Sequence, residues 1–196
     1  MPDYYYTANP TSAHEERSFR AVFAGRTLAF DTDAGVFSKQ HIDPGSELLC
    51  RSLPQDLAGD VLDLGCGWGA MTVMTLAAHP DVRMTMADIN ERALALAVGN
   101  VQKNGMQARA LLSDGFAQIE GMFDAVITNP PIRAGKAVIY GMFEDARAHL
   151  RPGGALYLVI RKQQGAPSAL KFLKGLYAGA EVIERDGGYW VIACRV

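Results

Sequence analysis

The residues whose types and spacing best suit a chemical role are Asn129, Pro130, Pro131 and Ile132, which follow the short apolar run 124–128. The side-chain oxygen of Asn129 and the carbonyl of Pro130 are two hydrogen-bond acceptors, and such a pair suits a planar NH2 group. Proline at 130 biases Asn129 toward an extended backbone, and both prolines fix φ, so the acceptors are held rigidly. The tetrapeptide is also compatible with a plain strand-ending loop. As a site, it predicts that Asn129 and Pro130 aim a planar amine at an electrophile.

A glycine-rich segment stands about two βα units upstream, Asp63-Leu64-Gly65-Cys66-Gly67-Trp68-Gly69. Glycines between a strand and a helix let the backbone approach a ligand closely and leave helix N–H groups free. Many strand-to-helix turns use glycine only for packing, which is the alternative here. Asp88 favours the ligand-binding interpretation, because an acid at the end of the next strand can accept both hydroxyls of a ribose.

Two cofactor classes share this arrangement, NAD and S-adenosylmethionine. The spacing is G-x-G-x-G, so the third position of the dinucleotide fingerprint is Ala70. Asp63, immediately inside the loop, would repel a pyrophosphate and would favour a cationic sulfonium or ammonium group. Both points favour S-adenosylmethionine.

A third acid, Asp114, follows the next predicted strand, with Phe116 beside it. This pair could bind an adenine amino group and cover its ring, although Asp114 could instead be the N-cap of the following turn. Cys66 has no partner base, so a nucleophilic role is not expected. The predicted cofactor-binding residues are Asp63, Gly65, Cys66, Gly67, Gly69, Asp88, Ile89, Ser113, Asp114 and Asn129.

Strands and helices alternate from Asp60 onward, which predicts a parallel sheet covered by helices on both faces. Ligand sites in such sheets lie beyond the carboxyl ends of the strands, where three acids and Asn129 are expected. The closing pair 180–184 and 189–194 predicts an antiparallel edge. The predicted strands are 61–64, 82–87, 107–112, 123–128 and 155–160, and the predicted helices are 68–78, 91–104, 136–150 and 168–178.

The N-terminal quarter of the chain differs from the rest, because 19–24 and 27–31 predict a hairpin turning at Gly25-Arg26. We therefore divide the chain into a β preface, residues 1–50, and a cofactor-binding domain, residues 51–196. Both parts are expected to form one domain, since 196 residues suffice for one sizeable core.

Composition excludes several classes of protein. The net charge of −2 argues against bulk electrostatic binding of nucleic acid, although 146–180 holds basic residues and no acids. That stretch predicts either a solvated helix face or a nucleic-acid contact. Three cysteines without CxxC spacing indicate a reduced cytoplasmic protein with no metal site. The N-terminus is not a signal peptide, and the apolar runs are too short to span a bilayer. Oligomeric state is left open.

The motifs together resemble class I S-adenosylmethionine-dependent methyltransferases that act on planar nitrogens. Three segments, Val36-Phe37-Ser38, Asp43-Pro44-Gly45-Ser46-Glu47-Leu48-Leu49 and residues 129–136, are similar to single-domain relatives of the small-subunit ribosomal RNA guanine-N2 methyltransferases. The resemblance implies a Rossmann-like α/β fold, with a mostly parallel seven-stranded sheet, an antiparallel last strand and the small β preface.

The resemblance also implies residue roles. Gly65 and Gly67 would bind the methionine part of the cofactor, Asp88 its ribose and Asp114 its adenine amino group. Most amino-methyltransferases place an aromatic residue after the two prolines, where it stacks on the target, whereas this chain has Ile132. Phe37 could supply a ring from the other side. The implied substrate-binding residues are Phe37, Pro131, Ile132, Arg133 and Lys136.

The implied activity is methylation of the exocyclic N2 of a guanine in small-subunit (16S) ribosomal RNA, with ribosomal RNA or the small subunit as partner. One alternative acceptor is a protein glutamine amide, as in release-factor methylation, and the Phe37 and Asp43 segments favour RNA over it. Another alternative is a non-catalytic S-adenosylmethionine-binding assembly factor, against which the intact Asn129 argues. An NAD oxidoreductase is a further alternative, but no proton donor is evident near the strand ends.

Overall fold

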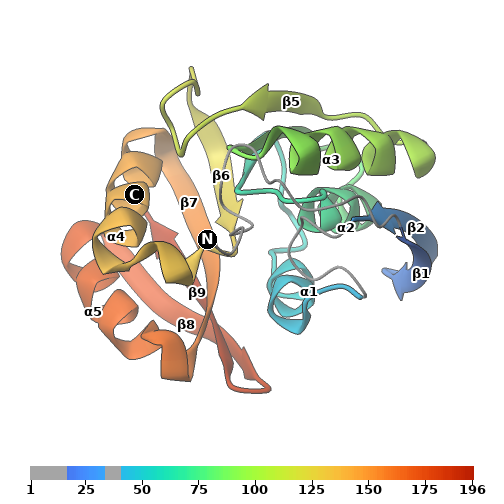
Figure 1. Cartoon of the computed structure of the whole chain (residues 1–196). Helices are drawn as coiled ribbons and strands as arrows, with labels where there is room; N and C mark the ends of the chain where they lie inside the picture. The colour runs from blue at the N-terminus through green and yellow to red at the C-terminus, as the bar shows by residue number, and fades with distance from the viewer. Residues whose placement is uncertain (1–16, 34–40) are drawn as a thin grey trace, which may run out of the picture.

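The computed structural model describes residues 17–33 and 41–196, and its centre is a seven-stranded sheet in the order β5-β4-β3-β6-β7-β9-β8 (Figure 1). The five strands from β5 to β7 run parallel, whereas β9 is antiparallel to both of its neighbours. The predicted seven-stranded sheet with an antiparallel last strand is therefore confirmed. The strands are β3 (Asp60–Leu64), β4 (Arg83–Asp88), β5 (Arg109–Leu112), β6 (Phe123–Thr128), β7 (Leu150–Arg161), β8 (Gly179–Asp186) and β9 (Tyr189–Arg195).

The closing pair forms the antiparallel edge expected from sequence, and within that pair the last strand lies inside the sheet. β9 inserts between β7 and β8, so β8 forms the edge. Val191, Ile192, Ala193 and Cys194 are all buried, because both faces of β9 are covered. Most residues of β8 are exposed. The more apolar strand of the closing pair takes the internal position, where two neighbours satisfy its backbone.

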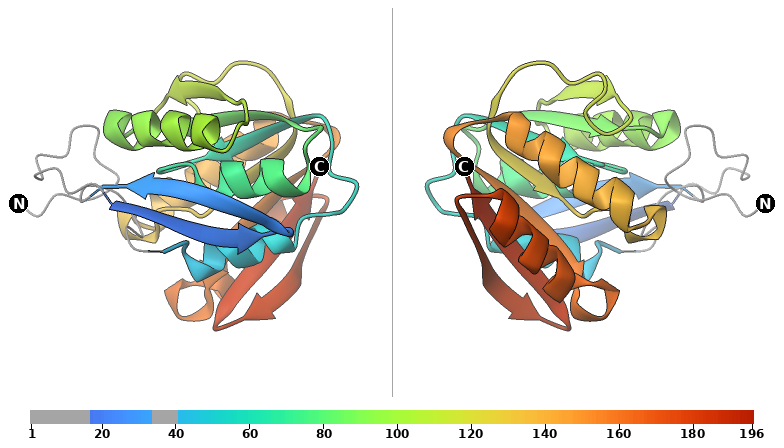
Figure 2. Two further views of the ribbon diagram at one scale, coloured as in Figure 1. Left: turned by 90° about the vertical axis from the view of Figure 1, so that its right-hand side faces the viewer. Right: turned by 90° about the vertical axis from the view of Figure 1, so that its left-hand side faces the viewer.

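Helices cover both faces of the sheet (Figure 2). One face carries α1 (Pro44–Arg51), α2 (Ala70–Ala78) and α3 (Glu91–Lys103), and the other carries α4 (Lys136–Ala148) and α5 (Ala166–Leu176). Side chains of β7 alternate between two cores, with Tyr157 and Val159 on the first face and Leu156 and Leu158 on the second. Burial on both faces explains why the central strands read as continuous apolar runs.

The predicted N-terminal hairpin is present as β1 (Arg17–Phe23) and β2 (Arg26–Thr32), which pair in a separate two-stranded sheet. It packs over α2 and α3, on the same face of the large sheet. Trp68 meets the rings of Phe19 and Phe30 edge-on, with ring centroids 5.8 and 5.2 Å away. The hairpin therefore contacts the glycine loop directly. α1 runs across residue 50, and the division at that residue stays a prediction.

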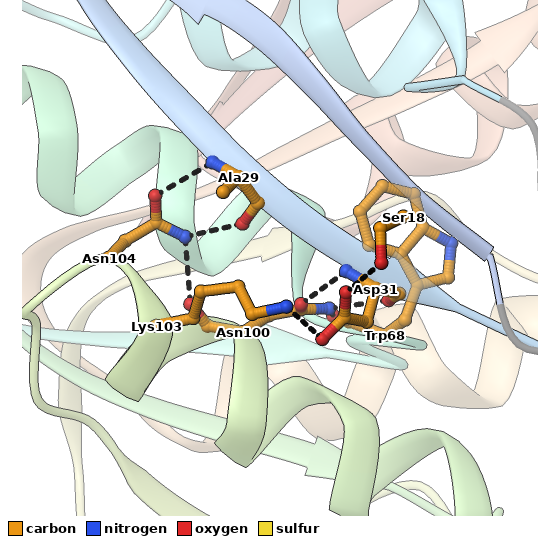
Figure 3. A network of polar contacts seen from close by, with 7 residues as sticks. All are labelled: Ser18, Ala29, Asp31, Trp68, Asn100, Lys103 and Asn104. Atoms are coloured by element: carbon orange, nitrogen blue, oxygen red, sulfur yellow. Dashed lines mark hydrogen bonds and ion pairs between the residues drawn. The ribbon is translucent and has the colours of Figure 1, made fainter.

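Two asparagines, Asn100 in α3 and Asn104 at its C-cap, bind the backbone of β2 (Figure 3), and we call them the hairpin amides. Asn104 accepts from the N–H of Ala29 at 3.0 Å and donates to its carbonyl at 2.7 Å. Asn100 accepts from the N–H of Asp31 at 2.7 Å and donates to its carbonyl at 2.8 Å. It also donates to the carbonyl of Trp68 at 2.8 Å. Four helical residues rise about 6 Å and two strand residues about 6.8 Å, so the spacings match.

Candidate active site

A cavity of about 270 Å³ opens beyond the carboxyl ends of β3, β4, β5 and β6. This is the position predicted for a ligand site in an open parallel sheet. Of the sequence-predicted site residues, the structure brings nine together on its wall: Gly65, Cys66, Gly67, Asp88, Ile89, Ser113, Asp114, Asn129 and Pro131.

The glycine loop is fastened to the end of β4. The N–H groups of Gly65 and Cys66 both donate to the carbonyl of Ala87, at 2.8 and 3.0 Å. The N–H of Gly67 donates to Oδ2 of Asp88 at 2.8 Å. The loop and the acid after the next strand are thus parts of one hydrogen-bonded unit.

Gly69 allows the loop to lie close to α3. It has a φ of +84°, and a Cβ there would stand 3.0 Å from the Cα of Ala97. A side chain at this position would push the loop away from α3. Gly69 thus shapes the cavity from behind, and it is not among the residues that line it.

Asp63 is fully buried in β3 and has an unused acceptor. Its Oδ2 accepts from Oγ1 of Thr72 at 2.7 Å, while its Oδ1 has no hydrogen-bond partner within the described part of the chain. Burial, with a smaller contribution from the charge of Asp88, raises the pKa of Asp63 to about 7. A carboxylate in this state would be stabilised by a cationic group nearby.

Asp88 is held in a fixed orientation by the backbone. Its Oδ1 accepts from the N–H of Asn90 and its Oδ2 from that of Gly67, both at 2.8 Å. Burial raises the pKa of Asp88, and these backbone bonds act in the opposite direction. The carboxylate is therefore held in one orientation at the cavity wall.

Asp114 is exposed at the cavity wall after β5. The N–H of Gln118 donates to Oγ of Ser113 at 3.1 Å, so Ser113 provides the side-chain acceptor of the turn. The alternative role that the sequence left for Asp114 is thereby taken by its neighbour. The carboxylate of Asp114 stands at the cavity with Ile89 and Gly115.

Asn129 is oriented by two residues at the start of α1, the N-cap Asp43 and Ser46, that the sequence analysis did not assign to the site. Its Nδ2 donates to Oδ2 of Asp43 at 3.1 Å and to Oγ of Ser46 at 3.0 Å. Its Oδ1 accepts no hydrogen bond from the described residues. Asp43 and Ser46 also line the cavity. Asp43 caps α1 with Pro44 at the first turn, and this Asp-Pro-x-Ser pattern was the available sequence signal.

The structure does not bring the other predicted site residues to the cavity wall. Ile132 lies half-buried in a short 3-10 turn and packs against the core on the α4 and α5 face. Arg133 and Lys136 are exposed, and the Lys136 ammonium lies 5.0 Å from the centre of the Tyr140 ring. Pro130 is buried next to the cavity residues Asn129 and Pro131. Asp63 and Gly69 lie behind the glycine loop. Phe37 lies outside the described residues.

Apolar side chains from α4 complete the wall and were missed by sequence reasoning. Val138 and Met142, one turn apart on α4, line the cavity with Ala134. Val138 is 52% exposed and therefore offers an apolar surface to the cavity. The i, i+4 spacing just after the Asn-Pro-Pro motif was the only signal in the sequence.

Neither a metal centre nor a membrane span is found in residues 17–33 and 41–196. No group of three or more potential ligands comes together there, and no helix is long and apolar enough to cross a bilayer. Burial raises the pKa of the Cys66 thiol far above its usual value, so this residue stays protonated at neutral pH.

The strand order, the internal antiparallel last strand and the cavity beyond the glycine loop form the Rossmann-like arrangement of class I S-adenosylmethionine-dependent methyltransferases, and the chain is of that class. Residues 27–193 match the family of the methyltransferase small domain. The chain belongs to this family.

Individual relatives agree with that assignment. The "Uncharacterized protein YbxB" of Bacillus subtilis (strain 168) is 35% identical over 199 residues, which cover all of this chain and 99% of that protein. The ribosomal RNA small subunit methyltransferase C of Shewanella loihica is 40% identical over 152 residues, or 75% of this chain.

Among solved structures, the T. thermophilus 16S rRNA N2 G1207 methyltransferase in complex with AdoMet and guanosine superposes with a TM-score of 0.82 at 28% identity, over 95% of this chain. The chain spans 44% of the Shewanella protein and 52% of the T. thermophilus one, or about half the length of each.

Proposed function

We propose that this chain transfers a methyl group from S-adenosylmethionine to the exocyclic N2 of a guanine in small-subunit ribosomal RNA. One observation carries the proposal. The amide of Asn129 is held through its nitrogen, while its oxygen is left without a partner among the described residues, in the same cavity as the glycine loop. A fixed, unused acceptor beside a cofactor loop suits an NH2 group that must be presented to an electrophile.

The cavity fits the cofactor. When bound, S-adenosylmethionine supplies an electrophilic methyl group on a cationic sulfonium centre. Gly65 and Gly67 would lie against its methionine part, and the idle oxygen of buried Asp63 gives the local environment a negative potential that suits its cationic groups. Asp88, fixed by two backbone N–H groups, would accept the ribose hydroxyls, and Asp114 the adenine amino group.

The chain's own contribution to chemistry is to orient the amine. The lone pair of an exocyclic amine is delocalised into its ring, which makes it a poor nucleophile. Asn129 Oδ1 and the Pro130 carbonyl would each accept one N–H, turning the lone pair toward the methyl group and favouring tetrahedral geometry. Because both acceptors are preorganised, little reorganisation is needed in the transition state. The amine proton can leave after methyl transfer.

Three features support a nucleic-acid base as the acceptor. The apolar wall made by Val138 and Met142 suits a flat ring, and exposed Arg133 and Lys136 stand just past the motif, where phosphate could lie. The names of the Shewanella and T. thermophilus relatives point to ribosomal RNA. A base within a helix would have to be splayed out to reach Asn129.

The test is transfer of tritiated methyl from S-adenosylmethionine to total RNA, small subunits and protein from a strain that lacks this chain, followed by nucleoside analysis. We expect label in N2-methylguanosine of the small-subunit RNA. The matched control is the Asn129→Ala variant, which should bind the cofactor and leave the RNA unlabelled. Label found only in protein would reverse the assignment in favour of a glutamine acceptor.

A further inference from the structure

We propose that Asp43 is the positioning residue of this site: it turns the Asn129 amide so that Oδ1 faces the substrate, and its charge strengthens that oxygen as an acceptor. The inference rests on the proposed function, and it concerns a residue that does not itself touch the amine. Asp43 and Asn129 are 86 residues apart in the chain, since Asp43 is the N-cap of α1 and Asn129 directly follows β6.

Amide orientation follows from the hydrogen-bonding capacities of the partners. An ionised carboxylate only accepts, so it can pair with the Nδ2 end of Asn129 and not with the Oδ1 end. Ser46 Oγ lies 3.3 Å from Oδ2 of Asp43, to which it donates, and this leaves its lone pairs to accept from Asn129 at 3.0 Å. A flipped amide would place Oδ1 of Asn129 against the carboxylate of Asp43 and lose that bond, whereas the Ser46 hydroxyl can donate as well as accept. Asp43 is therefore the residue that selects the orientation.

Asp43 is itself fixed from several sides. Its Oδ2 accepts from the N–H of Ser46 at 2.9 Å as the N-cap of α1. Its Oδ1 lies 3.4 Å from the hydroxyl of Tyr189 on β9, and that hydroxyl accepts from Arg161 of β7 at 2.6 Å. The start of α1 packs tightly on the Tyr189 ring, since a Cβ on Gly45 would come within 2.6 Å of it. Asp43 therefore joins α1 and β9 to Asn129.

The charge of Asp43 matters in addition to its geometry. Positive charge develops on the amine as the methyl group arrives. A carboxylate that accepts from Nδ2 polarises the Asn129 amide and places more negative charge on Oδ1, because hydrogen bonds in a chain strengthen one another. The effect is greatest when the amine is most positive, so it favours the transition state over the ground state.

Two substitutions separate these effects from the capping role. Asp43→Ser keeps a good N-cap but is too short to reach Asn129. Asp43→Asn keeps the cap and the reach and removes the charge. We expect Asp43→Ser to lower kcat by about 10–100-fold and Asp43→Asn by about 3–10-fold, as for loss of one preorganising contact. Melting temperature and cofactor Kd should stay close to those of the parent chain, with Kd changed by less than about threefold.

A second readout needs no methyl acceptor. The chain has five asparagines, so their ¹⁵N-labelled side-chain NH2 signals can be assigned one by one with Asn→Ala variants. We expect hydrogen exchange of the Asn129 NH2 to be slowed in the parent chain and to become at least about tenfold faster in Asp43→Ser. The NH2 groups of the hairpin amides, Asn100 and Asn104, should be unaffected and serve as the internal control.

The outcomes distinguish the two proposals. If Asn129→Ala abolishes RNA methylation but Asp43→Ser changes neither turnover nor Asn129 exchange, the positioning role is wrong and the proposed function stands. If the parent chain methylates no RNA, the proposed function fails, and the exchange measurement still decides the orientation of the amide. In the double variant Asp43→Ser/Asn129→Ala we expect no further loss beyond Asn129→Ala, and additive losses would show that Asp43 acts independently.

Discussion

Asparagine side chains perform opposite tasks in two regions of this molecule, the contact between the hairpin and α3 and the cavity beyond β6. Asn100 uses its oxygen and both of its N–H groups on backbone atoms, and Asn104 does the same. Asn129 uses only its nitrogen, and its oxygen has no partner among the described residues. Because Asn129 is half-buried and lines the cavity, this free oxygen is available to a ligand there.

The carboxylates repeat this contrast. In the hairpin contact, Asp31 pairs with Lys103 and buried Asp33 pairs with Arg92. The hydrogen bond from Lys103 lowers the pKa of Asp31. Beneath the glycine loop, by contrast, Asp63 is buried and forms no ion pair with any described residue, and burial raises its pKa. The paired carboxylates hold the hairpin in place. The unpaired carboxylate of Asp63, by contrast, would be stabilised by a cationic ligand in the cavity.

The largest effect on turnover is expected at Asn129, whose side-chain oxygen has no partner among the described residues. Asn129→Ala should lower kcat by about 10²–10³-fold, because it removes a preorganised acceptor for the reacting amine. Cofactor affinity, measured by calorimetry, should change by less than about threefold, since the main contacts proposed for the cofactor, at Gly65, Gly67, Asp88 and Asp114, follow other strands. The control is Asn104→Ala, which should leave kcat intact. Equal losses of cofactor affinity and turnover would contradict the role assigned to Asn129.

The satisfied amide should behave in the opposite way. Asn100→Ala leaves the N–H and carbonyl of Asp31 and the carbonyl of Trp68 without their partner, which should cost about 3 kcal/mol of unfolding free energy. Urea unfolding measures this. At a temperature where the variant is folded and the cofactor saturating, turnover should stay within about threefold of the parent. A large loss of turnover without loss of stability would place Asn100 in the site.

The unpaired carboxylate of Asp63 should make the stability of the folded chain depend on pH. Its pKa is about 7 in the folded chain against a usual value of 3.8, so the folded state binds the proton more tightly. Stability of the cofactor-free chain should therefore fall as pH rises toward 7 and level off above it, by roughly 2 kcal/mol between pH 5.5 and 8.

Asp63→Asn should remove that decline in stability. The measured quantity is the unfolding free energy of the parent minus that of the variant at each pH, from urea unfolding. This subtraction is needed because the raised pKa of Asp88 and the lowered pKa of His79 also make stability depend on pH. Cofactor binding should become tighter in the parent as pH rises, since the deprotonated carboxylate favours a cation, and the variant should lose this dependence. An unchanged pH dependence in the variant would contradict the assignment.

The smallest effect is expected at the end of α3. Asn104→Ala removes the half-buried pair of bonds to Ala29, which water can partly replace, and should cost about 1 kcal/mol. Hydrogen exchange at the Ala29 N–H should quicken while that at the Asp31 N–H stays protected. If both become unprotected, the hairpin amides act as one unit and not as two separate contacts.

Much of the fold could be predicted because its signals are local. Strand and helix periods, the hairpin turn at Gly25 and the glycines of the cofactor loop are set by residues a few positions apart, and those elements are present. Asp88, Asp114 and Asn129 share one cavity, as strand ends on one edge of a parallel sheet must. Their roles in binding and catalysis stay predictions.

The sequence by itself thus determined the elements, the edge of the sheet that carries the site and the kind of chemistry the motifs suit. Only the tertiary structure decided that β9 lies between β7 and β8, that Ile132 turns to the core and that Asp43 reaches Asn129. It also decided that, among the described asparagines, Asn100 and Asn104 are fully hydrogen-bonded whereas Asn129 keeps a free oxygen. These facts depend on pairings between residues far apart in the chain, which follow from packing of whole elements and leave no local pattern.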